Sequence, residues 1–334
     1  MQKNYGVKFT AFSSALPSKI VTNKDLEKLF DTTDEWIYTR TGIKERRVVS
    51  GNETGVSLSA IAARDVLAKA KLDPKDLDLI ILATTTPDKL YPSMSCLLQG
   101  ELGASNAFCF DLSAACSGFV YGIITAAQYI YNGSCKNILV VGVDIHSRFL
   151  DWSERSVAVL FGDGAGAVLI QNCLPQDDEL MSYLAYSAGD LKLDLTLPNE
   201  NIIYPNICKE INPNFVKMNG KAIYQFAVKV VPDIVTKILD KTSLKLEQID
   251  YLVLHQANQR IIDTVSEKIG FNSSRVISTI EKVGNTSAAS IPLAIVDSIS
   301  SGKIVAPCKM LLIGFGAGLT WGALLINWHE NKNI

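Results

Sequence analysis

Two stretches of this chain repeat each other and decide its fold. Residues 72–82 read LDPKDLDLIIL, and residues 244–254, which lie 172 positions later, read LKLEQIDYLVL. Each begins as a polar turn and continues into an apolar run without alternation, the pattern of a strand covered on both faces. Further pairs follow in the same order: ILVVG at 138–142 with MLLIG at 310–314, again 172 apart, and GAVLI at 166–170 with GALLI at 322–326, 156 apart. The shared order and offset indicate an internal duplication.

Helical patterns lie between these strands. Residues 57–70 and 221–239 carry apolar side chains at helical spacing, and alternating strands and helices predict an α/β protein whose sheets are sandwiched by helices. The change of offset puts about sixteen extra residues in the first half, around 146–161. We place the boundary between the halves in the linker-like stretch NCLPQDD at 172–178, which divides the chain into domains 1–175 and 176–334.

Composition narrows the class of protein. Hydrophobic residues make up 48% of the 334 residues and charged residues 20%, which is typical of a well-cored soluble protein. A formal charge of −2 gives no reason to expect nucleic acid or a membrane as partner. The uncharged stretch 112–135 contains several polar and glycine residues, so we interpret it as a buried helix and not a membrane span. Seven cysteines without C-x-x-C spacing and three histidines predict neither disulfides nor a metal site, and favour a reducing compartment.

Three residues with complementary chemistry follow or precede predicted strands. Cys116 comes after the strand-like 108–112 among small residues, at the start of the buried helix, where the helix dipole favours a thiolate and can stabilise an oxyanion. His255 directly follows the strand-like 251–254, and Asn285 lies in a small polar turn that opens another helix. Open α/β sheets build their sites at such strand ends. A cleft between the halves would bring the three together.

The motifs around these residues resemble those of β-ketoacyl-[acyl-carrier-protein] synthase III. The similar segments are DLSAACSG at 111–118, HQAN at 255–258, GNTSAAS at 284–290, GFGAG at 314–318, DEWIYTRTGI at 34–43 and FGDGAGA at 161–167. The resemblance runs from about residue 5 to the C-terminus. It implies a thiolase-like, five-layered αβαβα fold built from two similar halves and working as a homodimer, which agrees with the duplication.

The resemblance also implies a reaction. Cys116 would take an acyl group from an acyl-coenzyme A primer, with acetyl-coenzyme A expected, and malonyl-acyl-carrier protein would then lose CO₂ and condense with it. The 3-oxoacyl product would begin type II fatty acid biosynthesis. His255 and Asn285 would donate hydrogen bonds to the enolate, and the backbone of Cys116, Gly316 and Ala317 would form a second oxyanion hole. We expect no metal and no redox cofactor.

Binding residues are inferred from the same resemblance. Trp36 and Arg40 are spaced i, i+4 in a helix that Thr32 or Thr33 could cap, and an indole beside a guanidinium suits an adenine nucleotide. The predicted coenzyme A contacts are Trp36, Arg40, Arg155, Asn219, Gly220 and Asn258. Arg260, Lys217 and Lys221 could form a basic patch for an acidic carrier protein. The predicted carrier-protein contacts are Gln256, Ala257, Asn258, Gln259, Arg260, Lys217 and Lys221.

Two positions depart from the usual pattern of the family. Tyr91 stands before Pro92 and Ser93, where Phe is frequent, in the loop that would reach into the partner subunit's acyl pocket, so primer length and polarity are left open. Ala317 stands where Gly is frequent and constrains only the turn.

Four other functions share some of these sequence features. A polyketide or quinolone-type condensing enzyme uses the same three residues and stays an alternative. A papain-like cysteine hydrolase has the same order of Cys, His and Asn, but its local signature is missing. A dinucleotide-binding loop at 162–166 is rejected because 167–171 continues as a strand. A non-catalytic thioester-binding protein is disfavoured because all three positions are filled. The expected location is the cytoplasm or a plastid stroma, since no leader is recognisable.

Overall fold

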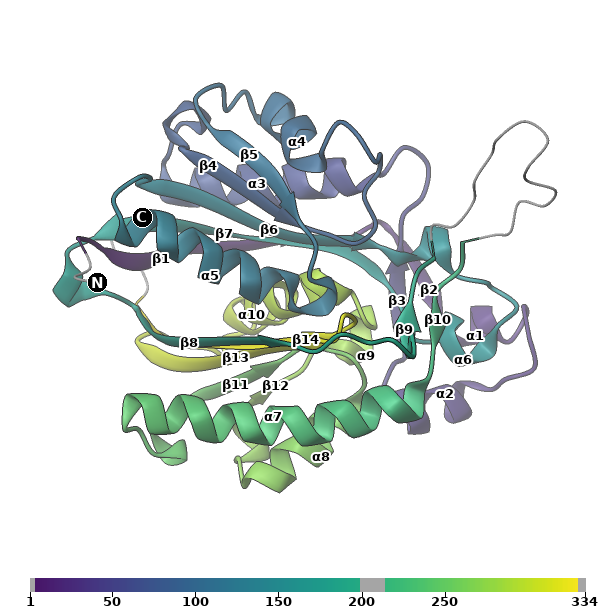
Figure 1. Ribbon diagram of the computed structural model, residues 1–334. Helices are drawn as coiled ribbons and strands as arrows, with labels where there is room; N and C mark the ends of the chain where they lie inside the picture. The colour runs from purple at the N-terminus through teal and green to yellow at the C-terminus, as the bar shows by residue number, and fades with distance from the viewer. Residues whose placement is uncertain (1–3, 199–213, 330–334) are drawn as a thin grey trace.

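Two five-stranded sheets lie face to face, with a layer of helices between them and further helices outside each (Figure 1). This computed structural model describes residues 4–198 and 214–329, and Cys208 lies outside the described residues. The layers therefore alternate α, β, α, β, α, which is the arrangement predicted from the sequence. The six described cysteines are free thiols.

The two sheets have the same strand order. The first is β1-β7-β6-β4-β5 and the second β8-β14-β13-β11-β12. In each, four strands run in the same direction and one, β7 or β14, runs against them, so two neighbouring pairs are parallel and two are antiparallel. The strands are β1 (Gly6–Ala15), β4 (Leu79–Ala83), β5 (Phe108–Leu112), β6 (Asn137–Ile145) and β7 (Asp163–Cys173), then β8 (Leu180–Ser187), β11 (Tyr251–Leu254), β12 (Val276–Ile277), β13 (Cys308–Gly316) and β14 (Thr320–Trp328).

The register of the strands repeats as the sequence does. Leu79 of β4 pairs with Ile138 of β6, and Tyr251 of β11 pairs with Met310 of β13, so both partners are shifted by 172 residues. The internal duplication is therefore confirmed in three dimensions. The first sheet draws its strands from residues 6–173 and the second from 180–328. The boundary near residue 175 lies between these sets, and its use as a domain limit stays a prediction.

Helices cover both faces of each sheet, which explains why the strands lack alternation. Ile81 of β4 packs into the central core with α5 (Gly118–Tyr131) and α10 (Ser290–Ser300), while its neighbour Ile80 packs outward into the core that α3 (Gly55–Ala70) and α4 (Met94–Leu102) complete. The second sheet is covered outside by α7 (Gly220–Thr242) and α8 (Gln259–Ile269). These helices include both helical patterns read from the sequence.

Short elements gather at one end of the layers and form a cap beside the strand ends (Figure 1). They are β2 (Lys19–Thr22), α1 (Asn23–Leu26), α2 (Asp34–Thr41), β3 (Glu45–Val48), α6 (Arg155–Ala158), β9 (Leu195–Thr196), β10 (Lys217–Met218) and α9 (Ile280–Val283). Arg46 ties this cap together from a fully buried position, donating to the carbonyls of Val21 (3.1 Å) and Val159 (3.0 Å) and to Asn23 Oδ1 (2.9 Å). Burial lowers the pKa of this guanidinium to about 10, so it stays charged at neutral pH.

The two central helices begin in equivalent tight turns. Ala115–Ser117 precedes α5 and Ser287–Ala289 precedes α10, again 172 residues apart, and Ala115 and Ser287 both adopt left-handed backbone angles (φ 45° and 50°). Each turn rests on a glycine of a strand from the opposite half. A Cβ on Gly142 would lie 2.4 Å from the Ala288 carbonyl oxygen, and one on Gly314 would lie 3.0 Å from Ser117 Cα. Only glycine permits this approach of backbone to sheet.

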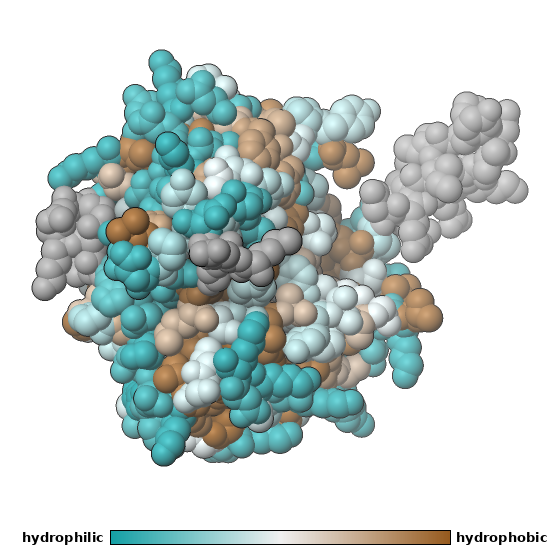
Figure 2. Space-filling model, turned by 60° about the vertical axis from the view of Figure 1, so that its left-hand side comes forward, coloured by the Kyte–Doolittle hydropathy of each residue, from teal (hydrophilic) through white to brown (hydrophobic). Residues whose placement is uncertain are grey.

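The uncharged stretch 112–135 is a buried helix, as predicted, although α5 occupies only Gly118–Tyr131 of it. No helix within residues 4–198 and 214–329 is long and apolar enough to cross a membrane. Figure 2 shows one face of the molecule, on which hydrophilic side chains separate the hydrophobic ones into patches.

We predict that Gly142→Ala lowers the free energy of unfolding by about 1–3 kcal/mol, because the backbone of residue 288 cannot move away cheaply. Gly100→Ala in α4 is the matched control. No atom lies within 4 Å of its Cβ position, and alanine there should add about 0.5–1 kcal/mol because it is the better helix former. Urea unfolding of both variants measures the difference, and equal stability of the two would contradict the packing described.

Candidate active site

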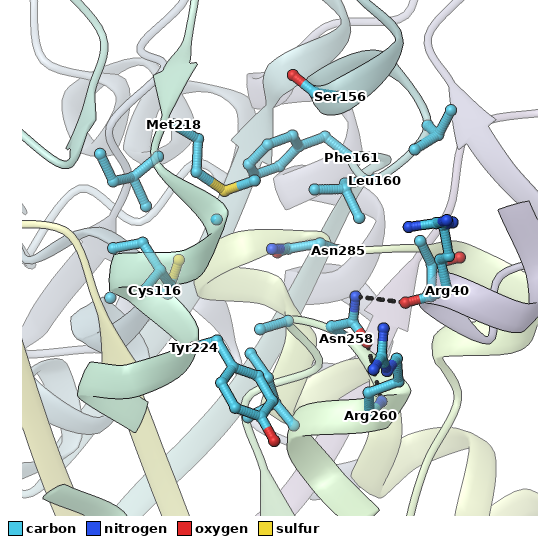
Figure 3. A pocket seen from close by; sticks show the side chains of 18 of the residues that line it. Arg40, Cys116, Ser156, Leu160, Phe161, Met218, Tyr224, Asn258, Arg260 and Asn285 are labelled. Atoms are coloured by element: carbon cyan, nitrogen blue, oxygen red, sulfur yellow. Dashed lines mark hydrogen bonds between the residues drawn. The ribbon is translucent and has the colours of Figure 1, made fainter. Parts of the chain in front are cut away.

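A cavity of about 550 Å³ lies between the two halves and brings together residues that the sequence spreads over 280 positions. Figure 3 shows Cys116 on one side of it and Arg40 and Arg260 on the other, with Asn285 and Asn258 between them. Among the residues predicted to act in catalysis or binding, those that line it are Trp36, Arg40, Cys116, Gly220, Lys221, His255, Ala257, Asn258, Arg260, Asn285 and Gly316.

Cys116 lies in the turn before α5, and its side chain is 6% exposed. A Cβ on Gly316 would lie 2.8 Å from Cys116 Cβ and 3.0 Å from its Sγ, so the end of β13 packs directly against the sulfur. Behind Cys116 lies a second cavity of about 270 Å³, which Ala317 also lines. The predicted oxyanion residues Cys116, Gly316 and Ala317 are therefore neighbours, and their role stays a prediction.

Ser287 is a contact that the sequence did not reveal. Its hydroxyl donates to the Sγ of Cys116 at 3.4 Å, from the turn before α10. The residue lies inside the motif GNTSAAS, but only the fold shows that this turn faces the other half's equivalent turn. A hydrogen bond to sulfur stabilises its anionic form.

The thiol of Cys116 is protonated in this resting structure. Burial raises its pKa to about 12, and the negative charge of Asp144 adds to the rise, while the hydroxyl of Ser287 and the backbone act in the opposite direction. We expected the helix N-terminus to favour a thiolate. Burial outweighs the contacts that favour the anion, so the thiol loses its proton only as it reacts.

His255 follows β11, as predicted, and its backbone and its ring each contact a residue of β13. Its backbone N–H donates to the carbonyl of Ile313 (2.8 Å), and the ring meets Phe315 edge-on at 5.3 Å. Burial lowers the pKa of His255 to about 3, and the nearby His146 contributes to the lowering. The imidazole is therefore neutral at physiological pH. Its Nδ1 is buried and makes no hydrogen bond within the described residues.

Asn285 is fixed by the extra segment of the first half. Its N–H donates to Leu160 O (2.8 Å) and its carbonyl accepts from Gly162 N (3.0 Å), which forms a single parallel bridge. Its side-chain Oδ1 accepts the N–H of Ser287 (2.9 Å). That bond orients the amide, so its Nδ2 donors are left for a group in the cavity (Figure 3).

Asp144 is a second residue that the sequence analysis missed. It is fully buried at the end of β6, where its carboxylate accepts from Thr85 N (2.8 Å) and Thr86 Oγ1 (3.0 Å) and, across the two halves, from Ala288 N (3.2 Å). It thus holds the turn that carries Ser287. No local pattern marks this role, because the contact joins residues 144 positions apart.

The predicted coenzyme A residues gather around Trp36. Thr33, one of the two predicted caps, accepts from Trp36 N at 3.1 Å and begins α2. The guanidinium groups of Arg40 and Arg155 lie 4.7 Å and 4.4 Å from the centroid of the indole, so two cations stack on one ring. Arg155 also donates to Asp31 O (2.9 Å). Trp36 and Arg40 of this cluster line the cavity.

Asn258 and Asn219 are helix caps in this structure. Asn258 Oδ1 accepts from Arg260 N (2.9 Å) at the start of α8, and its Nδ2 donates to Arg40 O (3.1 Å), which links α2 to the loop of His255 (Figure 3). Asn219 caps α7 and donates to Asp194 (2.9 Å). Gly220, next to it, lines the cavity. A role of these residues in ligand binding stays a prediction.

Comparison with known proteins places this site in a family. Two family models described as 3-oxoacyl-[acyl-carrier-protein] synthase III match, one at residues 110–189 and its C-terminal counterpart at 239–328. A β-ketoacyl-[acyl-carrier-protein] synthase III from Trichormus variabilis is 45% identical over 98% of this chain and 99% of its own. The chain belongs to the β-ketoacyl-[acyl-carrier-protein] synthase III family.

Relatives in this family come from bacteria and from a plastid. A chloroplastic β-ketoacyl-[acyl-carrier-protein] synthase III from Arabidopsis thaliana is 44% identical over 97% of this chain and 83% of its own length. The crystal structure of a 3-oxoacyl-[acyl-carrier-protein] synthase III from Aquifex aeolicus superposes with a TM-score of 0.89 at 41% identity, covering 97% of this chain and all of that one. The αβαβα arrangement is therefore the thiolase-like fold of the synthase III family.

One predicted carrier-protein contact of this synthase III family member needs correction. Gln256 is fully buried, where its Nε2 donates to Leu254 O (2.7 Å) and its Oε1 accepts from Thr279 N (2.9 Å). With its polar atoms used inside the protein, it cannot take part in a docking surface. It instead fixes the loop that follows His255.

The other residues predicted to dock the carrier protein lie at or near the surface. Lys217, Lys221 and Arg260 are exposed, and the last two line the mouth of the cavity. Gln259 is half-buried between Asp263 and Ser278, to which it is hydrogen-bonded (2.7 and 2.8 Å), and Ala257 is partly exposed.

Tyr91 lies outside the cavity of its own chain. It is 85% exposed in the loop before α4, beside Leu90, which is 77% exposed. An exposed apolar pair of this kind is typical of a surface that another protein covers.

The described residues hold no group of three or more His, Cys, Asp or Glu that could bind a metal ion.

We predict that alkylation of Cys116 by iodoacetamide keeps accelerating from pH 8 to pH 10.5. A thiol with an ordinary pKa of 9.0 would level off above that pH, whereas burial raises the pKa of Cys116 to about 12. Ser287→Ala removes a donor to the sulfur and should slow the reaction at each pH. Mass spectrometry of the peptide follows the rate, with free cysteine in the same solution as the control. A rate that is constant above pH 9 would refute the assignment.

Proposed function

We propose that this protein is a 3-oxoacyl-[acyl-carrier-protein] synthase III, which condenses a short acyl-coenzyme A primer with malonyl-acyl-carrier protein. The observation that carries the proposal is the meeting of Cys116, His255 and Asn285 in one cavity between the halves, in a chain of this family. Cys116 is the proposed nucleophile, and the two others are the proposed hydrogen-bond donors. The reaction would begin type II fatty acid synthesis, in a bacterial cytoplasm or a plastid stroma.

The first half-reaction moves the acyl group onto Cys116. Its sulfur attacks the thioester carbonyl, the bond between carbonyl carbon and coenzyme A sulfur breaks, and the departing sulfur takes up the proton that the Cys116 thiol loses. No net base is consumed, which suits a thiol whose pKa burial raises to about 12. The proposed oxyanion hole, made by the backbone at Cys116 and at Gly316 and Ala317, stabilises the charge on the carbonyl oxygen.

The second half-reaction makes the carbon–carbon bond. Malonyl-acyl-carrier protein loses CO₂, and the electron pair of the broken bond passes into an enolate. The neutral imidazole of His255 and the oriented amide of Asn285 donate hydrogen bonds to the enolate oxygen. The enolate carbon attacks the acyl thioester, and Cys116 leaves and regains a proton from solvent. A charged histidine is not needed, because a hydrogen-bond donor and not a strong acid stabilises the enolate.

Coenzyme A is proposed to enter along the cavity from its Trp36 end. The indole with Arg40 and Arg155 offers an aromatic face and two positive charges, which suit an adenine and its phosphates. The exposed Lys221 and Arg260 at the mouth, together with the exposed Lys217, suit an acidic carrier protein. The proposal includes no metal and no redox cofactor, since each step exchanges only acyl groups, protons and CO₂.

A homodimer is part of the proposal. Strand β5 is one edge of the first sheet, and Phe108 on it is 48% exposed; Leu90 and Tyr91, in the loop before α4, are exposed as well. An open edge with apolar neighbours favours pairing with a second copy. Tyr91 would then reach the acyl cavity of the partner.

The deciding experiment is incubation with radiolabelled acetyl-coenzyme A, followed by digestion to locate the label. Label on Cys116, and its loss in Cys116→Ala, would support the proposal, and label elsewhere or none would refute it. Measuring CO₂ release from malonyl-acyl-carrier protein against malonyl-coenzyme A separates the fatty acid synthase from the polyketide or quinolone-type alternative.

The roles of His255 and Asn285 predict a split between the half-reactions. His255→Ala and Asn285→Ala should each lower decarboxylation of malonyl-acyl-carrier protein by about 10²–10³-fold, because each removes one donor to the enolate. Transfer of the acetyl group to Cys116 should fall much less. Quench-flow labelling and CO₂ release measure the two steps. His329→Ala, a surface histidine at the end of β14, is the control. An equal loss in both steps would contradict the assignment.

Coenzyme A binding is tested on helix α2. Trp36→Ala should raise the Kd of acetyl-coenzyme A by about 5- to 30-fold, since it removes the face on which the adenine is proposed to stack, worth about 1–2 kcal/mol. Tyr38→Ala is the matched control, because Tyr38 is an exposed aromatic of the same helix that contacts Lys44 and does not line the cavity. Isothermal titration calorimetry measures both. Similar weakening by the two variants would refute the proposed nucleotide site.

A further inference from the structure

His146 is a buried histidine that the proposed reaction does not use. It begins the turn His146–Phe149 after β6, and its side chain is 7% exposed. The ring stacks on Phe161 with a centroid distance of 4.7 Å and an interplanar angle of 13°, which fixes its orientation. Its Nδ1 is fully buried without a hydrogen-bond partner, and the described residues supply no hydrogen bond to the ring.

The place of this ring suggests what it could bind. His146 lines the 270 Å³ cavity behind Cys116, together with the polar residues Thr85, Ser113, Thr196 and Ser287. An acyl group on the Cys116 sulfur would extend into this cavity, since the larger cavity on the other side leads to Trp36 and Arg40. The wall that faces the acyl chain is therefore polar in part.

Two of the hydroxyls in this wall already have partners. Thr85 Oγ1 donates to Asp144 at 3.1 Å, and Ser287 Oγ donates to Cys116 Sγ at 3.4 Å. His146 differs from them, because neither of its ring nitrogens has a hydrogen-bond partner among the described residues; Nδ1 is fully buried, so Nε2 is the nitrogen that can face the cavity. Polar groups inside native proteins are almost always hydrogen-bonded, so an oxygen atom of a substrate in the cavity is a fitting partner for this nitrogen.

We propose that His146 is a specificity-determining residue, whose ring hydrogen-bonds an oxygen carried by the acyl chain on Cys116. The preferred primers are then short acyl thioesters with a hydroxyl or keto group, and saturated chains of the same length are poorer substrates. This inference rests on the proposed function, because it requires an acyl group on Cys116. A site that hydrogen-bonds a substrate oxygen discriminates strongly against an analogue lacking it.

The test compares two primers that differ by one hydroxyl, 3-hydroxybutyryl-coenzyme A and butyryl-coenzyme A. The kcat/KM for acylation of Cys116 should favour the hydroxylated primer by about 10-fold or more in the wild type. His146→Leu has a similar volume and no polar atom, and should abolish or reverse the preference. His146→Gln keeps a hydrogen-bonding group and should retain part of it, which a purely structural role of the ring would not explain.

Several results would overturn the proposal. One is equal use of the two primers by the wild type, and another is an unchanged ratio in His146→Leu, with circular dichroism showing that the variant is folded. A third concerns Tyr91→Phe. If this variant and the double variant Tyr91→Phe/His146→Leu both give the primer ratio of His146→Leu, the two residues act together. The ring of His146 would then bond the tyrosine hydroxyl of a second copy and not the substrate. Wild-type labelling with acetyl-coenzyme A separates this failure from failure of the proposed function, which would leave Cys116 unlabelled.

Discussion

The structure depends on the contact of two backbone turns with two strand positions that are occupied by glycine. Each central helix begins in a turn with a left-handed residue, Ala115 or Ser287, and each turn lies on a glycine of the opposite sheet's middle strand, Gly314 or Gly142. Because no side chain intervenes, the two sheets and the helices between them are held at a fixed spacing. The cavity exists where these turns meet, so its geometry comes from backbone contacts and not from adaptable side chains.

Rigidity of this kind matters for the proposed chemistry. The N–H of Ser287 orients the amide of Asn285, and the hydroxyl of the same residue contacts the sulfur of Cys116, so one turn serves both groups. The loop after β11 is held in turn by the buried amide of Gln256. Donors that are already in place when charge develops cost no reorganisation during the reaction. Burial has the matching effect on protonation, because it keeps both the thiol and the imidazole uncharged in the resting protein.

Much of this arrangement could be predicted from the sequence, because the signals are local or repeated. Apolar runs in the same order, two pairs of them at one offset, predict the duplicated sheets. The strand before His255 and the helix after Cys116 predict where these two site residues lie. Contacts between distant segments could not be predicted. Asp144 meets Ala288 only after the halves pack, and Gln256 looks like an exposed loop residue until the turn buries it. Whether the ring of His146 finds a hydrogen-bond partner likewise depends on neighbours from several segments.

Asp144 and Gly316 occupy equivalent positions in the two halves, since they are 172 residues apart, the offset of the repeat. In the first half, the carboxylate of Asp144 accepts a hydrogen bond from the turn of Ala288. In the second half, Gly316 has no side chain, and the sulfur of Cys116 lies in the space beside it. A carboxylate at position 316 would set a negative charge against that sulfur. The two equivalent turns therefore differ in chemistry although their backbones correspond. One carries the proposed nucleophile, and its counterpart supports it.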